Sequence, residues 1–392
     1  MGYIKRSSAT SLAGWFILAI ALLSAISVTA YAVTRSGAPK PPKRPLASAV
    51  HNALTAKPVS GVTAQFTVDQ HLLTGTSTTL STNPLLAGAT GKVWVGGGHV
   101  RLVITSQLGT TAIAYDGSRV MLYDKKKHVA YVLPVKHHTT SKDATATHTA
   151  PSIADINHAL AQAAKFAVVS GAIPSNVAGR EAYAVHVSPK RNGGLFGELD
   201  LAWDAARGIP LRVALYPRGS STAAISITVT HIHFGPVAGS ALSVSPPAGT
   251  KIVRVRMPSH GKARSADAGR AHAAPATGVA AVTKAVGFSV AAPSALAGLP
   301  QGEVRSVDLG SHPAALVTYG RGLGTVFLLE QRATSGASAL SSLPSASIGG
   351  IKGRELDTTL GTVVQWSSGG VTYTIAGSQS AARIMSAAQS LA

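Results

Sequence analysis

The acidic and histidine residues that could do chemistry are few in this chain and poorly placed for it. Glu198 and Asp200 lie two apart on a predicted strand and therefore share one face. The opposite face carries the apolar side chains of Leu199, Leu201 and Trp203. We therefore expect both carboxylates to face solvent rather than a catalytic cleft. His231 and His233 have the i, i+2 spacing of a metal pair, but the chain has no Cys and no H-E-x-x-H helix to supply further ligands. Neither a catalytic site nor a metal site is predicted.

Three further motifs favour the same conclusion. His137-His138 lies in residues 136–150, a polar segment without apolar periodicity that is predicted to be a loop. Gly320-x-Gly322-x-Gly324 has the wrong spacing for a nucleotide fingerprint and precedes a strand rather than a helix, which predicts a hairpin turn. The nucleophile motif G-x-S-x-G is absent from the sequence. We expect a protein that is not an enzyme and uses no cofactor.

Composition limits the partners. The 392 residues include 35 Lys and Arg against 15 Asp and Glu, a net charge of +20, although only 13% of residues are charged. Aromatic residues make up 5%, and no basic recognition helix is evident, which disfavours nucleic acid. Anionic lipid headgroups or cell-wall polymers are the expected anionic partners. Because there is no Cys, disulfides and a lipid-modified Cys are excluded.

The first 34 residues are predicted to be a signal anchor or a signal peptide. Lys5 and Arg6 precede the apolar segment Leu12–Val33, which is long enough to span about 30 Å of hydrocarbon. An A-x-A at residues 30–32 offers the alternative of cleavage after Ala32, which would leave a secreted form. Both alternatives are export signals. We expect a single-pass protein of the cell membrane whose part beyond residue 45 is extracytoplasmic.

The remaining chain divides into a Pro-rich stalk (35–45), a first domain (46–256), an Ala/Gly/Pro-rich linker (257–284) and a small α+β C-terminal domain (285–392). The first domain is predicted to be mainly β, with a helix from Leu46 and another over Ser152–Phe166. In the strand Val62–Asp69, apolar and polar residues alternate. Near Thr230 the alternation slips by one residue, which predicts a β-bulge. Further strands are expected at Lys92–Val95, Val100–Thr105, Thr111–Tyr115, Arg119–Tyr123, Val129–Pro134, Ala182–Val187, Glu198–Trp203, Pro210–Tyr216 and Ile225–Phe234.

The C-terminal domain is predicted from fewer signals. Its four expected strands are Ala314–Tyr319, Thr325–Gln331, Thr362–Trp366 and Val371–Ile375. A last helix is expected to begin after Ser378.

The order of short motifs in residues 46–255 resembles the periplasmic lipoprotein-carrier family LolA, an outer membrane lipoprotein-sorting superfamily. After the first helix come VTAQFTVDQ, GKVWVGGGHVRLVI and IAYDGSRVMLYDKKKHVAYVL, similar to that family's F-x-A-x-F strand, G-x-W strand and DG hairpin. The matching residues are Ala64, Phe66, Gly91, Trp94, Arg101, Asp116, Gly117, Tyr123 and Asp124. VAGREAYAVHVSPK and GELDLAWDAARGIPLRVALY, with the later FGPV and PPAGT, resemble the related sigma-E regulatory group MucB/RseB and actinobacterial proteins of the superfamily.

This resemblance implies a LolA-like curved antiparallel half-barrel with a helical lid, whose apolar inner face takes up acyl chains. We then expect a lipid cavity beneath the helix Ser152–Phe166, lined by Ala64, Phe66, Val68, Leu102, Ile104, Ile156 and Leu160. A filled core without ligand is the alternative.

Three functions follow from these observations. The first is an extracytoplasmic protein that binds a lipid acyl chain or a lipoprotein. The second is an RseB-like regulatory protein that binds an anti-sigma factor or another membrane protein. The third is a cell-wall polymer binder that uses its positive charge.

Overall fold

The computed structural model describes residues 40–73, 88–135, 150–190, 194–243, 245–254, 275–309, 313–333, 340 and 343–392. The predicted N-terminal anchor, His137-His138 and the linker up to residue 274 lie outside these ranges. Within the described ranges, no helix is long and apolar enough to cross a bilayer.

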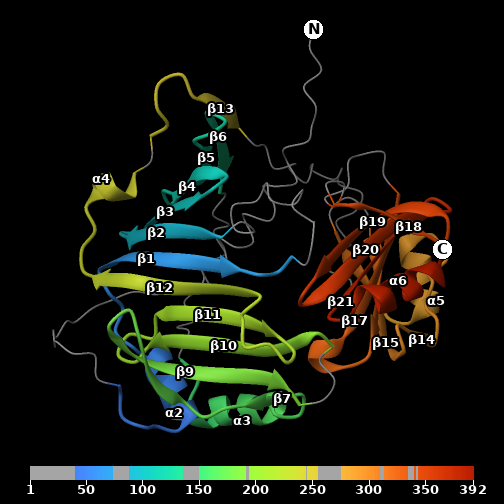
Figure 1. Cartoon of the computed structure of the whole chain (residues 1–392), viewed down its shortest axis with the longest axis horizontal. Coiled ribbons are helices and arrows are strands. Elements are labelled where there is room, and N and C mark those ends of the chain that lie inside the picture. The colour runs from blue at the N-terminus through green and yellow to red at the C-terminus, as the bar shows by residue number, and fades with distance from the viewer. Residues whose placement is uncertain are drawn as a thin grey trace, which may run out of the picture.

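The first unit is built on one 13-stranded sheet, antiparallel throughout except that β13 runs parallel to β6. Figure 1 shows how strongly the sheet turns, because β4–β6 are seen nearly end-on while β1 and β10–β12 lie in the plane of the view. β8 (Ile173–Val177) pairs with β9 beside the last strand of the sheet. From one edge to the other, the strands are β13 (Lys251–Arg254), β6 (Val129–Pro134), β5 (Arg119–Asp124), β4 (Gly109–Tyr115), β3 (His99–Ser106), β2 (Ala89–Gly96), β1 (Gly61–Gln70), β12 (Ile225–Phe234), β11 (Pro210–Pro217), β10 (Phe196–Asp204), β9 (Arg180–Pro189) and β7 (Ala167–Val169).

The predicted bulge in β12 is confirmed. Gln65 of β1 pairs with His231, whereas the next residue, Phe66, pairs with Val229, so Thr230 has no partner in the register. The extra residue keeps both halves of β12 in phase with β1, since Ile227 lies opposite Val68 and Ile232 lies opposite Ala64. One face of the sheet therefore stays apolar along the whole strand.

Two helices of the first unit lie at the β9–β7 end of the sheet, and a third lies beside β2 and β3. α2 (Leu46–Leu54) buries Ala49 against Tyr183 and Trp203 of β9 and β10. α3 (Ile153–Ala163) begins at a capping box, in which the Ser152 hydroxyl accepts from the Asp155 amide and the Asp155 carboxylate accepts from the Ser152 amide. α4 (Gly239–Leu242) is one short turn that contacts β2 and β3.

The predicted stalk is shorter than expected. Residues 40–45 are part of the first unit: the Tyr183 hydroxyl donates to the Pro42 carbonyl at 2.7 Å, and Arg44 forms a β-bridge with Ala172. Proline runs are stiff and lack most backbone donors, but their carbonyls still accept hydrogen bonds, and this is how the segment is held.

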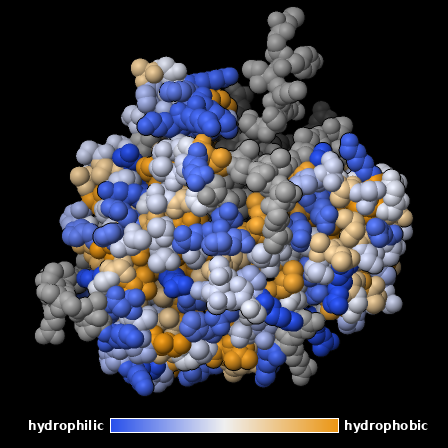
Figure 2. Space-filling view, viewed as in Figure 1, coloured by the Kyte–Doolittle hydropathy of each residue, from blue (hydrophilic) through white to orange (hydrophobic). Residues whose placement is uncertain are grey.

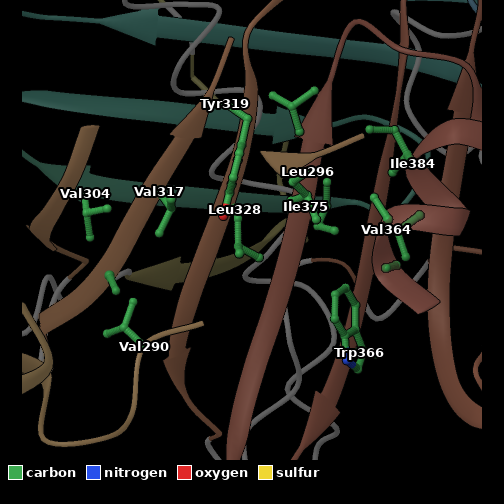
Figure 3. Packing of buried hydrophobic residues seen from close by; sticks show 14 of the residues in the cluster. Val290, Leu296, Val304, Val317, Tyr319, Leu328, Val364, Trp366, Ile375 and Ile384 are labelled. Atoms are coloured by element: carbon green, nitrogen blue, oxygen red, sulfur yellow. The ribbon is translucent and has the colours of Figure 1, made fainter. Parts of the chain in front are cut away.

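The second unit has its own 8-stranded sheet and its own hydrophobic core (Figure 3). Its strands, in spatial order, are β14 (Ala295–Leu296), β15 (Leu299–Asp308), β16 (Pro313–Tyr319), β17 (Val326–Arg332), β21 (Val371–Gly377), β20 (Gly361–Ser368), β19 (Ile351–Thr358) and β18 (Ser345–Ile348). α5 (Val279–Val286) and α6 (Ala381–Gln389) pack on the sheet, so the expected α+β architecture is observed.

Two boundaries in this region are corrected. α5 lies mostly within the predicted linker, and its Val282 and Val286 are buried in the second core, so the C-terminal unit already includes residues 275–284. A helix of eight residues makes only about two turns, so its apolar periodicity is too brief to be recognised in the sequence. α6 begins after Ser380 rather than Ser378, whose hydroxyl donates to the Leu360 carbonyl. The Gly320–Gly324 segment does connect β16 to β17 through a 3-10 turn, η3 (Gly322–Gly324), as predicted.

Candidate ligand-binding face of the large sheet

A continuous apolar row crosses eight strands of the large sheet. Each member lies opposite the next in the strand register, so their side chains share one face. From β12 to β13 the row consists of Ile232, Ala64, Val93, Leu102, Ile113, Leu122, Tyr131 and Val253.

A second apolar row extends the same face toward β9. It runs from β9 to β2 through Val185, Leu201, Val213, Ile227, Val68 and Ala89. The two rows meet on β1, because Ala64 and Val68 point to the same side. A single sheet with so long an apolar face must pack on other structure or enclose something apolar.

Five of the seven predicted lining residues are on this face. Phe66, Val68, Leu102 and Ile104 belong to one buried cluster with Ile113 and Leu122. Ala64 lies in the adjoining cluster with Val62 and Val95. Leu102 is 6% exposed and Ile104 1%. The prediction that they share a face is confirmed, while their role in lining a lipid cavity stays a prediction.

The other two predicted residues do not join them. Ile156 and Leu160 lie on α3, which contacts α2 and β7 at the far end of the sheet (Figure 1). Ile156 is buried and Leu160 is partly exposed, but neither belongs to the cluster of Phe66 and Leu102. The expectation that this helix covers the faces of β1 and β3 is therefore corrected. An amphipathic helix shows that it has a buried face, but its sequence does not show which surface buries that face.

The acidic pair on β10 is also placed differently from the prediction. Asp200 is 7% exposed, and its Oδ2 lies 3.3 Å from Nε of Arg212 on β11. Glu198 is half-exposed, and its Oε1 lies 3.1 Å from Nδ1 of His186 on β9. Arg212 also donates to the Tyr216 hydroxyl at 2.7 Å. The cross-strand guanidinium of Arg212 thus allows the Asp200 carboxylate to be buried on the polar face, and only the strand register brings the two together.

The remaining sequence motifs form no site in the described ranges. His231 and His233 are exposed on the polar face of β12, and no group of three or more His, Asp or Glu side chains there is arranged to hold a metal ion. Three pockets lie elsewhere and are lined mostly by residues that the sequence did not single out, although Glu198 lines the first and Asp116 the second. One of about 520 Å³ lies beside Tyr216, one of about 470 Å³ beside Met121, and one of about 620 Å³ beside Arg383.

The face of the molecule seen in Figure 2 is mixed in character. Hydrophobic residues appear there as small separate patches between hydrophilic ones, without a broad apolar surface. This agrees with the strand register, which directs the apolar rows to one side of the sheet and a polar set to the other.

Solved structures similar to this chain include both groups that its sequence resembles. MucB in complex with MucA from Pseudomonas aeruginosa is 15% identical, with a TM-score of 0.39, and the match covers 88% of this chain and 94% of that one. A putative outer membrane lipoprotein-sorting protein domain from Vibrio parahaemolyticus is 10% identical, with a TM-score of 0.20, and covers 50% of this chain and 94% of that one. No family model matches the sequence, and no curated protein matches it significantly. Both TM-scores are below 0.5.

Proposed function

We propose that this chain is an extracytoplasmic binding protein, held at the cell membrane or secreted, that takes up a lipid acyl chain on the apolar face of its large sheet. The observation that carries the proposal is the apolar row from Ile232 to Val253 across eight strands. The described helix that packs on this face, α2, covers its β9–β10 end, far from Leu102 (Figure 1).

An acyl chain suits such a face energetically. Each buried methylene contributes about 0.8 kcal/mol, so two added methylenes raise affinity by about tenfold or more. A chain lying across the strands needs no polar partner along its length, and the side chains of both rows are apolar apart from the hydroxyl of Tyr131 on β6. The ligand class is therefore a single acyl chain, with or without a protein attached to it.

The test is an uptake assay with a fluorescent fatty acid. Leu102→Glu places an unpaired charge in the middle of the row and should abolish uptake. Thr105→Glu is the matched control, because Thr105 is exposed and lies on the opposite face of the same strand. Circular dichroism checks that both variants fold. A folded L102E protein that takes up fatty acid like the wild type would contradict the proposal.

A second candidate, the regulatory protein that binds a membrane partner, is favoured by apolar exposure where the two units meet. Phe166 is 52% exposed and Val168 55%, and Gly322 of the second unit packs against Phe166, with Leu323 next to it 45% exposed. Exposed apolar patches of this kind mark protein interfaces. Phe166→Asp should then remove a co-purifying membrane protein without changing fatty-acid uptake, and the opposite result would exclude this surface.

A further inference from the structure

The pocket beside Met121 lies on the polar face of the large sheet, opposite the apolar rows. It has a volume of about 470 Å³, within the usual range for small-molecule sites. Its floor is formed by Ala114, Met121 and Val132, three neighbours in the strand register of β4, β5 and β6. Its roof includes Leu242 of α4 and Pro246. The pocket is therefore an apolar slot between the sheet and the segment that follows β12.

The roof is attached at both ends. Arg101 of β3 donates from Nη1 to the Ala241 carbonyl at 3.2 Å, and its guanidinium also lies 4.9 Å from the ring centre of Trp94. Beyond the roof, β13 pairs in parallel with β6. Because both attachments involve the sheet itself, the slot is preformed.

The floor of the slot is formed by the side chains of β4–β6 that alternate with those of the buried apolar face. On β4 and β5, Ile113 and Leu122 point to the buried apolar face, so Ala114 and Met121 point to the other side. Ala114 is small and leaves room above it, while the flexible side chain of Met121 adapts to irregular apolar ligands. These residues do not contribute to the Leu102 face.

The mouth of the slot carries positive charge. Asp116 and Arg119 neutralise each other through an ion pair of 2.6 Å between Oδ2 and Nε. Although partial burial opposes it, hydrogen bonds from Ser118 and Arg119 hold the pKa of Asp116 well below its usual value, so this carboxylate stays ionised. Arg254 of β13 is exposed at the same mouth, and its guanidinium contacts no acidic side chain within the described ranges. The net charge facing an incoming ligand is therefore positive.

We propose that this slot binds a single-chain anionic amphiphile, with its chain on Ala114, Met121 and Val132 and its anionic head at Arg254. A peptide fits less well, because the floor of Ala114, Met121 and Val132 is apolar and leaves the backbone N–H and C=O groups that face it without partners. The polar lining residues Ser243, Ser245 and His99 lie away from the floor. This site goes beyond the proposed function and does not depend on it, since the two faces share strands but no residues.

The four methionines of the chain allow a direct test. Methyl-¹³C methionine spectra of the full chain in phosphatidylcholine nanodiscs are titrated with decanoate, and Met121→Leu assigns the Met121 signal. Decanoate should shift the Met121 methyl saturably, while that of Met385, on α6 of the second unit, stays unmoved. Decanol, with the same chain and no charge, should bind at least tenfold more weakly.

Variants separate the contributions of charge and space. Arg254→Gln should weaken decanoate about tenfold and leave decanol unchanged, and Arg254→Lys should retain most of the decanoate affinity. Ala114→Phe should fill the slot and remove the response, with circular dichroism checking that the large β-sheet of the first unit is still folded. Leu102→Glu should keep the Met121 response whatever it does to fatty-acid uptake, so the two proposals fail separately. An unmoved Met121, or equal affinity for decanoate and decanol, would overturn this proposal.

Discussion

The amide of Phe196 donates to the hydroxyl of Ser378 at 2.7 Å and thereby joins the two units of the chain. The adjacent amide of Leu195 donates to the Ser378 carbonyl at 2.8 Å. A third contact lies at the tip of the β19–β20 hairpin, where the Thr359 amide donates to the Leu72 carbonyl at 2.9 Å. The units therefore meet through backbone groups, which constrain their relative placement more than side chains alone would.

Gly194→Ala should loosen this junction. Gly194 has φ +67°, and an added Cβ would overlap the Ser378 carbonyl oxygen, so the alanine is both strained and sterically blocked. We expect faster amide exchange at Leu195 and Phe196 by mass spectrometry while both cores keep their protection. Ser378→Ala removes two neutral hydrogen bonds, the one accepted from the Phe196 amide and the one donated to the Leu360 carbonyl, at about 1 kcal/mol each. Unchanged exchange in G194A would mean that the junction does not depend on this contact.

Gly91→Ala should destabilise the first unit. Gly91 lies opposite Phe66 in the register, and an added Cβ would overlap the Phe66 ring. Overpacking at such a position costs about 1–3 kcal/mol. Urea denaturation gives the change in unfolding free energy, with Gly171→Ala as the control, because a Cβ there meets no atom within 4 Å. Equal stability of the two variants would show that the Phe66 ring moves aside without cost.

The stability of the second unit should fall as pH rises from about 4.5 to 7. Burial raises the pKa of Glu330 to about 7, against the opposing effect of the hydrogen bond from the Ala291 amide to Oε2. The folded state then holds a proton that the unfolded state has already lost, so stability is complete below pH 4.5, declines up to about pH 7 and is level above it. The loss is at most about 3 kcal/mol.

Glu330→Gln should remove that slope and make the second unit more stable than the wild type at pH 8. The stability of the second unit at each pH is measured from the protection of the β17 amides in hydrogen exchange, corrected for intrinsic exchange rates. Glu303→Gln, at an exposed position of β15, is the control and should keep the wild-type slope. A wild-type slope in E330Q would assign the pH dependence to another group.

Trypsin should cut the chain first at Arg264 and Arg270. The sequence from 257 to 274 has no apolar period, whereas α5 protects Lys284 within the second unit. Limited proteolysis with N-terminal sequencing should give a stable fragment that begins near residue 271. Early cleavage at Lys284 instead would contradict the protection of this residue by α5.

Export is tested at the N-terminus. If Leu12–Val33 is retained, the protein should sediment with membranes, and external protease should remove the part beyond residue 45. A mature N-terminus at Val33 would show cleavage after Ala32 and a secreted form.

Sequence alone determined which stretches are strands or helices wherever a long period was present. The alternation in β1, the helix stripe of α2, the capping box of α3 and the slip at Thr230 all report on neighbours along the chain, and all are found as predicted. Short elements such as β7, β8, β13 and α5 were missed, because three to eight residues carry too little periodicity.

Only the tertiary structure decided what each face meets. The sequence shows that Ile156 has a buried side and that Asp200 is polar, but not that Ile156 packs at the α2 end of the sheet or that Arg212 lies beside Asp200. The slot over Met121 likewise depends on a segment more than 100 residues away returning across the polar face of the sheet. Such contacts depend on strand register and on chain reversal over long separations, and neither leaves a periodic trace in the local order of residues.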